Sequence, residues 1–183
     1  MRIEISEGEG LDRLSILELK LVEISDSQKR SAIETEIATL SELLPVKMKY
    51  SYYYRLLCDV NRKIWDLTNT VKQLVLTDPQ FGSVAHNIFE WNQSRFRVKS
   101  KINELVHSSI NEQKSYGQTA IHVQIEDGID HEILLNKLTH LSLSYDIVYI
   151  SCTEATQKYI VEYVPAFQYR INESCALAAT LLK

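Results

Sequence analysis

The stretch Tyr53–Leu74, YYRLLCDVNRKIWDLTNTVKQL, decides how the N-terminal part of the chain folds. Apolar side chains recur in it at alternating spacings of four and three residues, at Tyr53, Leu57, Val60, Ile64, Leu67, Val71 and Leu74. This repeat places one narrow apolar stripe along a helix, as in the contact line of a coiled coil. We therefore expect a long helix here that packs lengthwise against other helices.

The segments on either side carry related patterns. The repeat continues from Phe81 to Ile110, but Arg95 stands where an apolar residue is expected. The first segment, Gly10–Leu44, also has helical spacing, although its phase slips across the polar run Ser25–Arg30. Either one helix continues through the slip, or a second helix begins there with Asp26 or Ser27 as its N-cap.

Proline and glycine residues separate these segments, at Pro45, Pro79, Gly82 and Gly117. Three helices of roughly 30 residues would each be about 45 Å long, and short connections make neighbouring helices antiparallel. The expected N-terminal domain, residues 1–116, is a long antiparallel three-helix bundle of coiled-coil type.

Beyond Gly117 the pattern changes to β-α-β-α-β-α. The expected strands are 120–125, 147–151 and 167–171, and the expected helices are 129–143, 153–164 and a last helix after Asn172. Strands that alternate with helices of this length indicate right-handed crossovers and a parallel sheet. Residues 117–183 are therefore predicted to form a small three-stranded Rossmann-like α/β domain, which makes the whole chain α+β.

Composition excludes several classes of protein. The 183 residues carry 20 Lys and Arg against 24 Asp and Glu, a formal net charge of -4, whereas nucleic-acid-coating domains usually have a pI above ~9. No apolar run approaches the ~18 residues of a membrane span, and Met1-Arg2-Ile3-Glu4 does not begin a signal peptide. The 3 cysteines share no Cys-x-x-Cys spacing. We expect a cytoplasmic protein with no nucleic-acid partner, membrane span, metal or cofactor.

An ordered series of motifs in the first two thirds of the chain matches a family pattern. The motifs are Gly10-Leu11-Asp12-Arg13-Leu14-Ser15-Ile16-Leu17-Glu18-Leu19-Lys20, then Val60-Asn61, Ile64-Trp65-Asp66, Asn92, Arg95, Lys99, Ile102-Asn103 and Glu112-Gln113-Lys114-Ser115-Tyr116. On these motifs, residues 3–116 resemble a bacterial and phage domain family of unknown function. Because its members often lie beside or are fused to glycosyltransferase-like proteins, the resemblance implies a link with surface-polysaccharide or glycosyl-transfer pathways. It implies no activity.

The C-terminal part is similar in outline to the first half of a nucleotide-sugar glycosyltransferase fold. It lacks the Gly-x-Gly-x-x-Gly loop that holds phosphates in many Rossmann proteins.

Arg95 defines the first candidate site. A guanidinium in a helix contact line needs a carboxylate or several acceptors, since an unpaired buried charge is very costly. Candidate partners are Asp12, Glu18, Asp66, Asn61 and Asn92. Three interpretations remain: a polar network that fixes helix register, an anion or sugar-phosphate site, or an exposed arginine.

The second candidate site lies at the carboxyl ends of the predicted strands, where α/β sheets bind ligands. Its residues are Asp127, His131, Thr153 and Asn172. Thr153 and Asn172 are expected to be helix N-caps, and helix N-termini favour anions. His131 has the chemistry of a general base or a metal ligand, although a single histidine after a strand is more often structural or exposed. The acidic loop around Asp127 suits a metal or a cationic ligand better than a phosphate.

Two further features bear on function. Cys152, expected at a helix N-terminus, is a candidate nucleophile only if its pKa is lowered. A basic and aromatic cluster opens the second helix, with Lys47, Lys49, Tyr50, Tyr52, Tyr53, Tyr54 and Arg55. Such a cluster is typical of nucleic-acid, glycan or lipid binding, but it is equally suited to packing or to a dimer contact, which we favour.

Together these features favour a non-catalytic interaction module whose bundle drives homodimerisation, with a glycosyltransferase as a candidate partner. The alternative is a sugar-phosphate or nucleotide-sugar binding protein, or a glycosyltransferase-like enzyme, with a site between the bundle and the strand ends. A phage accessory protein is a third hypothesis.

Overall fold

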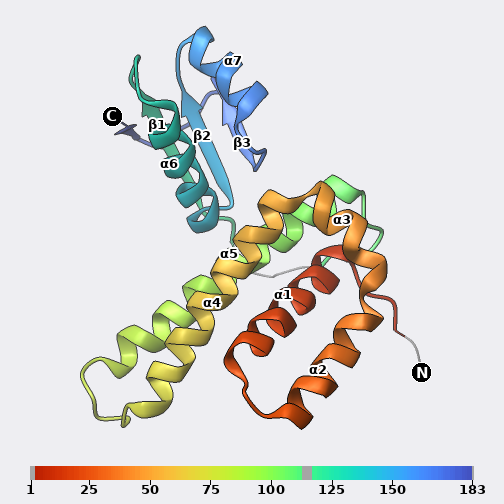
Figure 1. The fold of residues 1–183 in the computed structure, drawn as a ribbon. Coiled ribbons are helices and arrows are strands. Elements are labelled where there is room, and N and C mark those ends of the chain that lie inside the picture. Colours follow the sequence, from red (N-terminus) through yellow and green to blue (C-terminus); the bar gives the residue numbers. More distant parts are fainter. Residues whose placement is uncertain (1–2, 113–116, 183) are drawn as a thin grey trace. The chain divides into compact units, whose positions relative to one another are not determined.

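The computed structural model describes residues 3–112 and 117–182, which divide into two compact units at residues 113 and 114. Within the described residues the fold is α+β, with seven α-helices and one four-stranded sheet (Figure 1). The predicted boundary between Tyr116 and Gly117 adjoins residues 113–116, which lie outside the described part. In that part, no helix combines the length and the apolar composition needed to cross a bilayer.

The helical unit contains five α-helices and one short 3-10 helix. They are α1 (Glu7–Glu23), α2 (Ser27–Thr39), η1 (Ser41–Leu43), α3 (Leu44–Lys49), α4 (Ser51–Gln73) and α5 (Phe81–Val106). In Figure 1, α4 and α5 lie side by side as a hairpin, and α1 packs against both of them. The sequence predicted α4 and α5 well, because their apolar repeats are long and regular.

The first predicted helix is wrong as one continuous element. The chain leaves helical geometry at Ile24, and the Asp26 side chain accepts from the Lys29 backbone N–H at 2.9 Å to begin α2. The alternative with a second helix capped by Asp26 is therefore confirmed. Arg30 stabilises the break, since its guanidinium donates to the Leu21 and Ile24 carbonyls at the end of α1.

The core of the helical unit lies where α1 covers the hairpin. Its most deeply buried side chains are Leu11, Leu14, Leu17, Leu57, Val60, Val98 and Ile102. The predicted contact line on α4 is buried at Tyr53, Leu57 and Val60, but it is only half-buried from Ile64 onward. The structure thus does not confirm a bundle of three long helices, because α1 is too short to cover the whole hairpin.

The second unit is built around a parallel sheet. Its elements are β1 (Ala120–Ile125), α6 (His131–Ser144), β2 (Ile147–Ser151), α7 (Glu154–Tyr163), β3 (Tyr169–Ile171) and β4 (Ala179–Leu182). The strand order is β3-β2-β1-β4, and all neighbouring strands are parallel. This is the order of the first four strands of a Rossmann sheet.

The prediction of three strands and a last helix is wrong. Asn172 adopts a left-handed conformation with φ 55°, so the chain turns after β3 instead of starting a helix. Residues 179–182 then pair with the free side of β1, which would otherwise be an unpaired strand edge.

Helices α6 and α7 cover the same face of the sheet. Val123, Ile125, Val148 and Ile150 form one buried cluster with side chains from both helices. Because side chains alternate along a strand, the intervening residues of β1 and β2 lie on the opposite face. These intervening residues are His122, Gln124, Tyr149 and Ser151.

Candidate functional site

Arg95 lies in a polar network that joins three helices. Its guanidinium donates to Asn92 Oδ1 at 2.6 Å and to Asn61 Oδ1 at 3.4 Å, and its Nε lies 3.8 Å from Asp12 Oδ2. Asn61 in turn donates to Asp12 Oδ1 at 2.8 Å and to Ser15 Oγ at 2.7 Å. Side chains from α1, α4 and α5 are thus linked through one carboxylate and two amides.

The electrostatics of this network fit a structural role. The Asp12 side chain is only 6% exposed, against 27% for Arg95. Burial raises the pKa of Asp12, while the Asn61 hydrogen bond and the nearby Arg95 and Lys99 charges act to lower it. An incoming anion would meet this carboxylate and an arginine that already has partners, so the geometry favours a network that fixes helix register.

Two predicted partners of Arg95 lie elsewhere. Asp66 is on the exposed side of α4. Glu18 accepts from Lys47 Nζ at 2.6 Å and from the Tyr54 hydroxyl at 2.8 Å. Burial and the neighbouring Glu18 raise the pKa of Tyr54, and burial raises that of Cys58.

The basic and aromatic cluster is largely self-paired. Lys47 Nζ lies 4.5 Å from the centre of the Tyr54 ring, and Lys49 Nζ lies 5.0 Å from that of Tyr50. The Tyr50 hydroxyl donates to the Leu105 carbonyl at 2.9 Å. Because these cations and hydroxyls already have partners within the unit, the cluster fits the packing interpretation.

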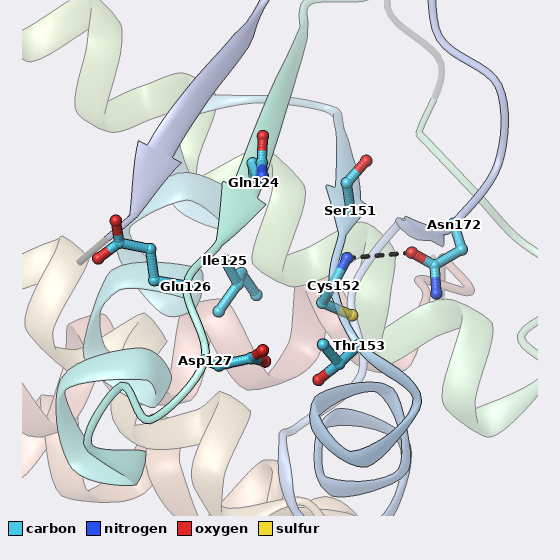
Figure 2. Close-up of a pocket in the computed structure, with 8 residues that line it drawn as sticks. All are labelled: Gln124, Ile125, Glu126, Asp127, Ser151, Cys152, Thr153 and Asn172. Carbon is cyan, nitrogen blue, oxygen red and sulfur yellow. Dashed lines mark hydrogen bonds between the residues drawn. The ribbon is translucent and has the colours of Figure 1, made fainter.

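A cavity of about 460 Å³ lies at the carboxyl ends of β1, β2 and β3 (Figure 2). The described residues that line it are Gln124, Ile125, Glu126, Asp127, Ser151, Cys152, Thr153 and Asn172. Three of the four residues predicted for the strand-end site, Asp127, Thr153 and Asn172, are therefore brought together here. In Figure 2 the Asp127 carboxylate points toward the turn formed by Cys152 and Thr153.

Asn172 joins two strand ends, and the prediction that it caps a helix is wrong. Its Oδ1 accepts from the Cys152 backbone N–H at 3.0 Å, and its Nδ2 donates to Gln157 Oε1 at 2.9 Å. Thr153 does occupy the N-cap position of α7, although its hydroxyl lies 3.2 Å from that of Thr156 and makes no side-chain capping bond. The turn between β2 and α7 is thus tied to the end of β3.

The remaining candidates at the strand ends are not placed for catalysis. His131 stacks on Tyr159, with ring centres 3.7 Å apart, and it is not among the described residues that line the cavity. Burial first, and the charge of Asp127 second, raise the pKa of Cys152, which keeps its thiol protonated. Among the described residues, no group of three or more side chains could hold a metal ion.

Sequence reasoning missed a pair on the uncovered face of the sheet. His122 Nε2 lies 2.8 Å from Ser151 Oγ, and His122 Nδ1 lies 3.0 Å from the Leu177 carbonyl oxygen. The strand limits were predicted, so the alternation of side chains already placed His122 and Ser151 on one face. Their proximity depends on the pairing of β1 with β2, in which His122 lies opposite Tyr149.

A helical unit followed by a small parallel α/β unit, with a cavity at the strand ends, defines the class of architecture but no activity. The model of a family of unknown function, DUF6165, matches residues 1–126, and the chain belongs to this family. The match covers the helical unit and extends through β1. No curated protein and no solved structure matches the chain.

Proposed function

We propose that the α/β unit binds a small uncharged polyhydroxyl compound, such as the sugar part of a larger ligand, in the strand-end cavity. The composition of the cavity lining carries this proposal. It offers the carboxylate of Asp127, the hydroxyls of Ser151 and Thr153, and the amide of Gln124. Carboxylates and amides are the groups that accept and donate hydrogen bonds to neighbouring sugar hydroxyls.

The charge of the cavity favours a neutral ligand over a phosphate. None of the described residues that line it is basic, and the two carboxylates repel an anion. The Cys152 backbone N–H at the start of α7 is already bonded to Asn172, so it is not free to hold a phosphate oxygen. We therefore propose that the cavity binds the hydroxyl groups of a sugar and not a sugar phosphate.

Calorimetry with three probes tests this proposal: a free hexose, the hexose 1-phosphate and a nucleoside diphosphate hexose. The hexose is expected to bind, and its phosphate no more tightly. Asp127→Asn should weaken binding about 10- to 100-fold, because a hydrogen bond to a charged acceptor contributes about 1.5–3 kcal/mol. Glu132→Gln, on the exposed start of α6, is the matched control. Absence of hexose binding, or tighter binding of the phosphate, would overturn the proposal.

We propose, as a second function, that the helical unit associates with a second copy of the chain. Three exposed apolar side chains of the α4–α5 hairpin favour this: Val75 and Leu76 in the turn, and Phe89 in α5. These side chains are 67%, 82% and 70% exposed, and the contact line leading to them is only half-buried. Large apolar side chains left exposed to this degree on one hairpin are a candidate contact surface for a second copy.

Light scattering over a range of concentrations tests association. The native chain is expected to have twice the monomer mass, and Leu76→Asp combined with Phe89→Asp should return it to the monomer. Val161→Asp is the control, because Val161 is equally exposed, at 71%, but lies in the other unit. A native chain that stays monomeric at all concentrations would exclude the dimer.

The cellular setting rests on the family resemblance. We propose that the chain, encoded by a bacterium or by a phage, works in the bacterial cytoplasm beside a glycosyltransferase of a surface-polysaccharide pathway. A sugar-binding α/β unit would suit that setting, either as a scaffold or as part of a glycosyl-transfer enzyme. Co-purification of the tagged chain with a glycosyltransferase from its native host tests this link.

A further inference from the structure

His122 and Ser151 lie on the face of the sheet that α6 and α7 leave uncovered. Their side chains come from adjacent strands, and both are half-buried. From their geometry, we propose that Ser151 is a nucleophile and His122 its general base, in acyl transfer from a small uncharged carboxylic ester. The proposal goes beyond sugar binding and does not depend on it.

The hydrogen bonds of His122 define its tautomer. The Leu177 carbonyl can only accept, so the bond of 3.0 Å places the ring proton on Nδ1. In the neutral ring Nε2 then carries a lone pair, which accepts the Ser151 hydroxyl proton across 2.8 Å. A base within hydrogen-bond reach of a hydroxyl, oriented by a third group, is the arrangement that activates serine nucleophiles.

Gln124 is placed to stabilise the oxyanion that forms during the reaction. It pairs with Ser151 across β1 and β2, so the two side chains lie on the same face of the sheet. Neighbouring strands of a sheet are about 4.8 Å apart. Both residues line the strand-end cavity (Figure 2). The Cys152 backbone N–H is already bonded to Asn172, so we assign the donor role to the Gln124 amide.

The reaction proceeds in two steps. Ser151 Oγ attacks the ester carbonyl carbon while its proton passes to His122 Nε2, and the tetrahedral intermediate then expels the alkoxide, which takes that proton and leaves as the alcohol. Water next attacks the acyl-serine, its proton passing through His122 to Ser151 Oγ, and the carboxylic acid is released. Glu126 and Asp127 beside the cavity favour an uncharged ester and repel the acid product.

Labelling of the full-length chain with a fluorophosphonate probe tests the proposal, because such probes phosphonylate activated serines. Mass spectrometry is expected to locate the label on Ser151, and Ser151→Ala should abolish it. His122→Gln should slow labelling by at least about 100-fold, the loss expected for a missing general base. Gln124→Met, which removes the amide donor at similar size, should slow it to a comparable degree. Ser174→Ala, at an exposed serine, is the matched control and should label like the native chain.

The comparison uses only variants whose melting temperature matches that of the native chain. Absence of label on Ser151 in the folded native chain would overturn the proposal, and so would an undiminished rate in folded His122→Gln. Labelling of Ser151 without hexose binding would refute the proposed sugar site and leave the nucleophile standing. Hexose binding without labelling of Ser151 would refute the nucleophile and leave the proposed sugar site standing.

Discussion

Asn61 holds the network at the centre of the helical unit, and its replacement by alanine should be strongly destabilising. The substitution removes a hydrogen bond of 2.8 Å to the buried Asp12 carboxylate and one of 2.7 Å to Ser15. The bond to the charged acceptor contributes about 1.5–3 kcal/mol and the neutral one about 1 kcal/mol. Alanine recovers about 0.5 kcal/mol in helix propensity. We expect the free energy of unfolding to fall by roughly 2–4 kcal/mol.

Tryptophan fluorescence during urea unfolding measures this effect in the correct unit. Both tryptophans of the chain, Trp65 and Trp91, lie in α4 and α5, so the signal reports the helical unit alone. With a slope of about 1–3 kcal/mol per molar urea, the midpoint should shift by roughly 0.7–4 M. Asn69→Ala is the control, because Asn69 is exposed on the same helix. A loss for Asn61→Ala within about 0.5 kcal/mol of the control would refute the network.

The same variant has a pH signature. Burial raises the pKa of Asp12 above its unfolded value of 3.8, so the folded state retains a proton that the unfolded state releases. The contribution of Asp12 to stability therefore falls as pH rises from its unfolded pKa to its raised folded pKa. The Asn61 hydrogen bond lowers the pKa of Asp12. Without this bond the folded pKa rises further, so stability falls over a wider range of pH. The loss of stability should be larger at pH 7 than at pH 4, and an equal loss would contradict this reasoning.

Substitutions at three further positions, Gly8, Asn172 and Tyr54, test particular contacts. Gly8→Ala should destabilise the helical unit by about 1–3 kcal/mol in the fluorescence assay, because its Cβ would lie 2.5 and 2.6 Å from oxygen atoms of α5. Gly82→Ala, in α5 of the same unit, meets no atom within 4 Å and should not be destabilising. Asn172→Gly should be more stable to heat than Asn172→Ala by about 1 kcal/mol, since only glycine adopts φ 55° without strain. Tyr54→Phe should leave the early part of the alkaline absorbance titration unchanged, because burial and Glu18 raise the pKa of Tyr54.

Much of the fold was predictable where local signals are strong. The repeats of α4 and α5, and the limits of β1 and β2, follow directly from apolar spacing. The break after α1 was recognised only as one of two alternatives. Asp26 gave a capping signal, but the contact of Arg30 with carbonyls of the preceding helix, which stabilises the break, gave none. That contact depends on how α2 returns along α1, and periodicity carries no information about it.

The candidate sites show the same division between local and long-range information. Arg95 stood out because a charge interrupts an apolar repeat, and Asp12, Asn61 and Asn92 were found with it. Asp66 was wrongly included because sequence motifs do not show which side of a helix faces its neighbours. Its place on the exposed side of α4 is fixed by the packing of α1 and α5.

The missed strand β4 and the missed pair of His122 and Ser151 have one cause. A final helix in place of β4 would leave β1 at the edge of the sheet, with nothing beside His122 on that side. The pairing of β4 with β1 instead brings the Leu177 carbonyl to His122 Nδ1. This carbonyl fixes the tautomer that lets Nε2 accept from Ser151. The chemistry proposed for Ser151 therefore depends on β4, the strand that local sequence patterns did not reveal. A change that displaces the turn at Asn172 should weaken the pairing of β4 with β1 and the activation of Ser151 together.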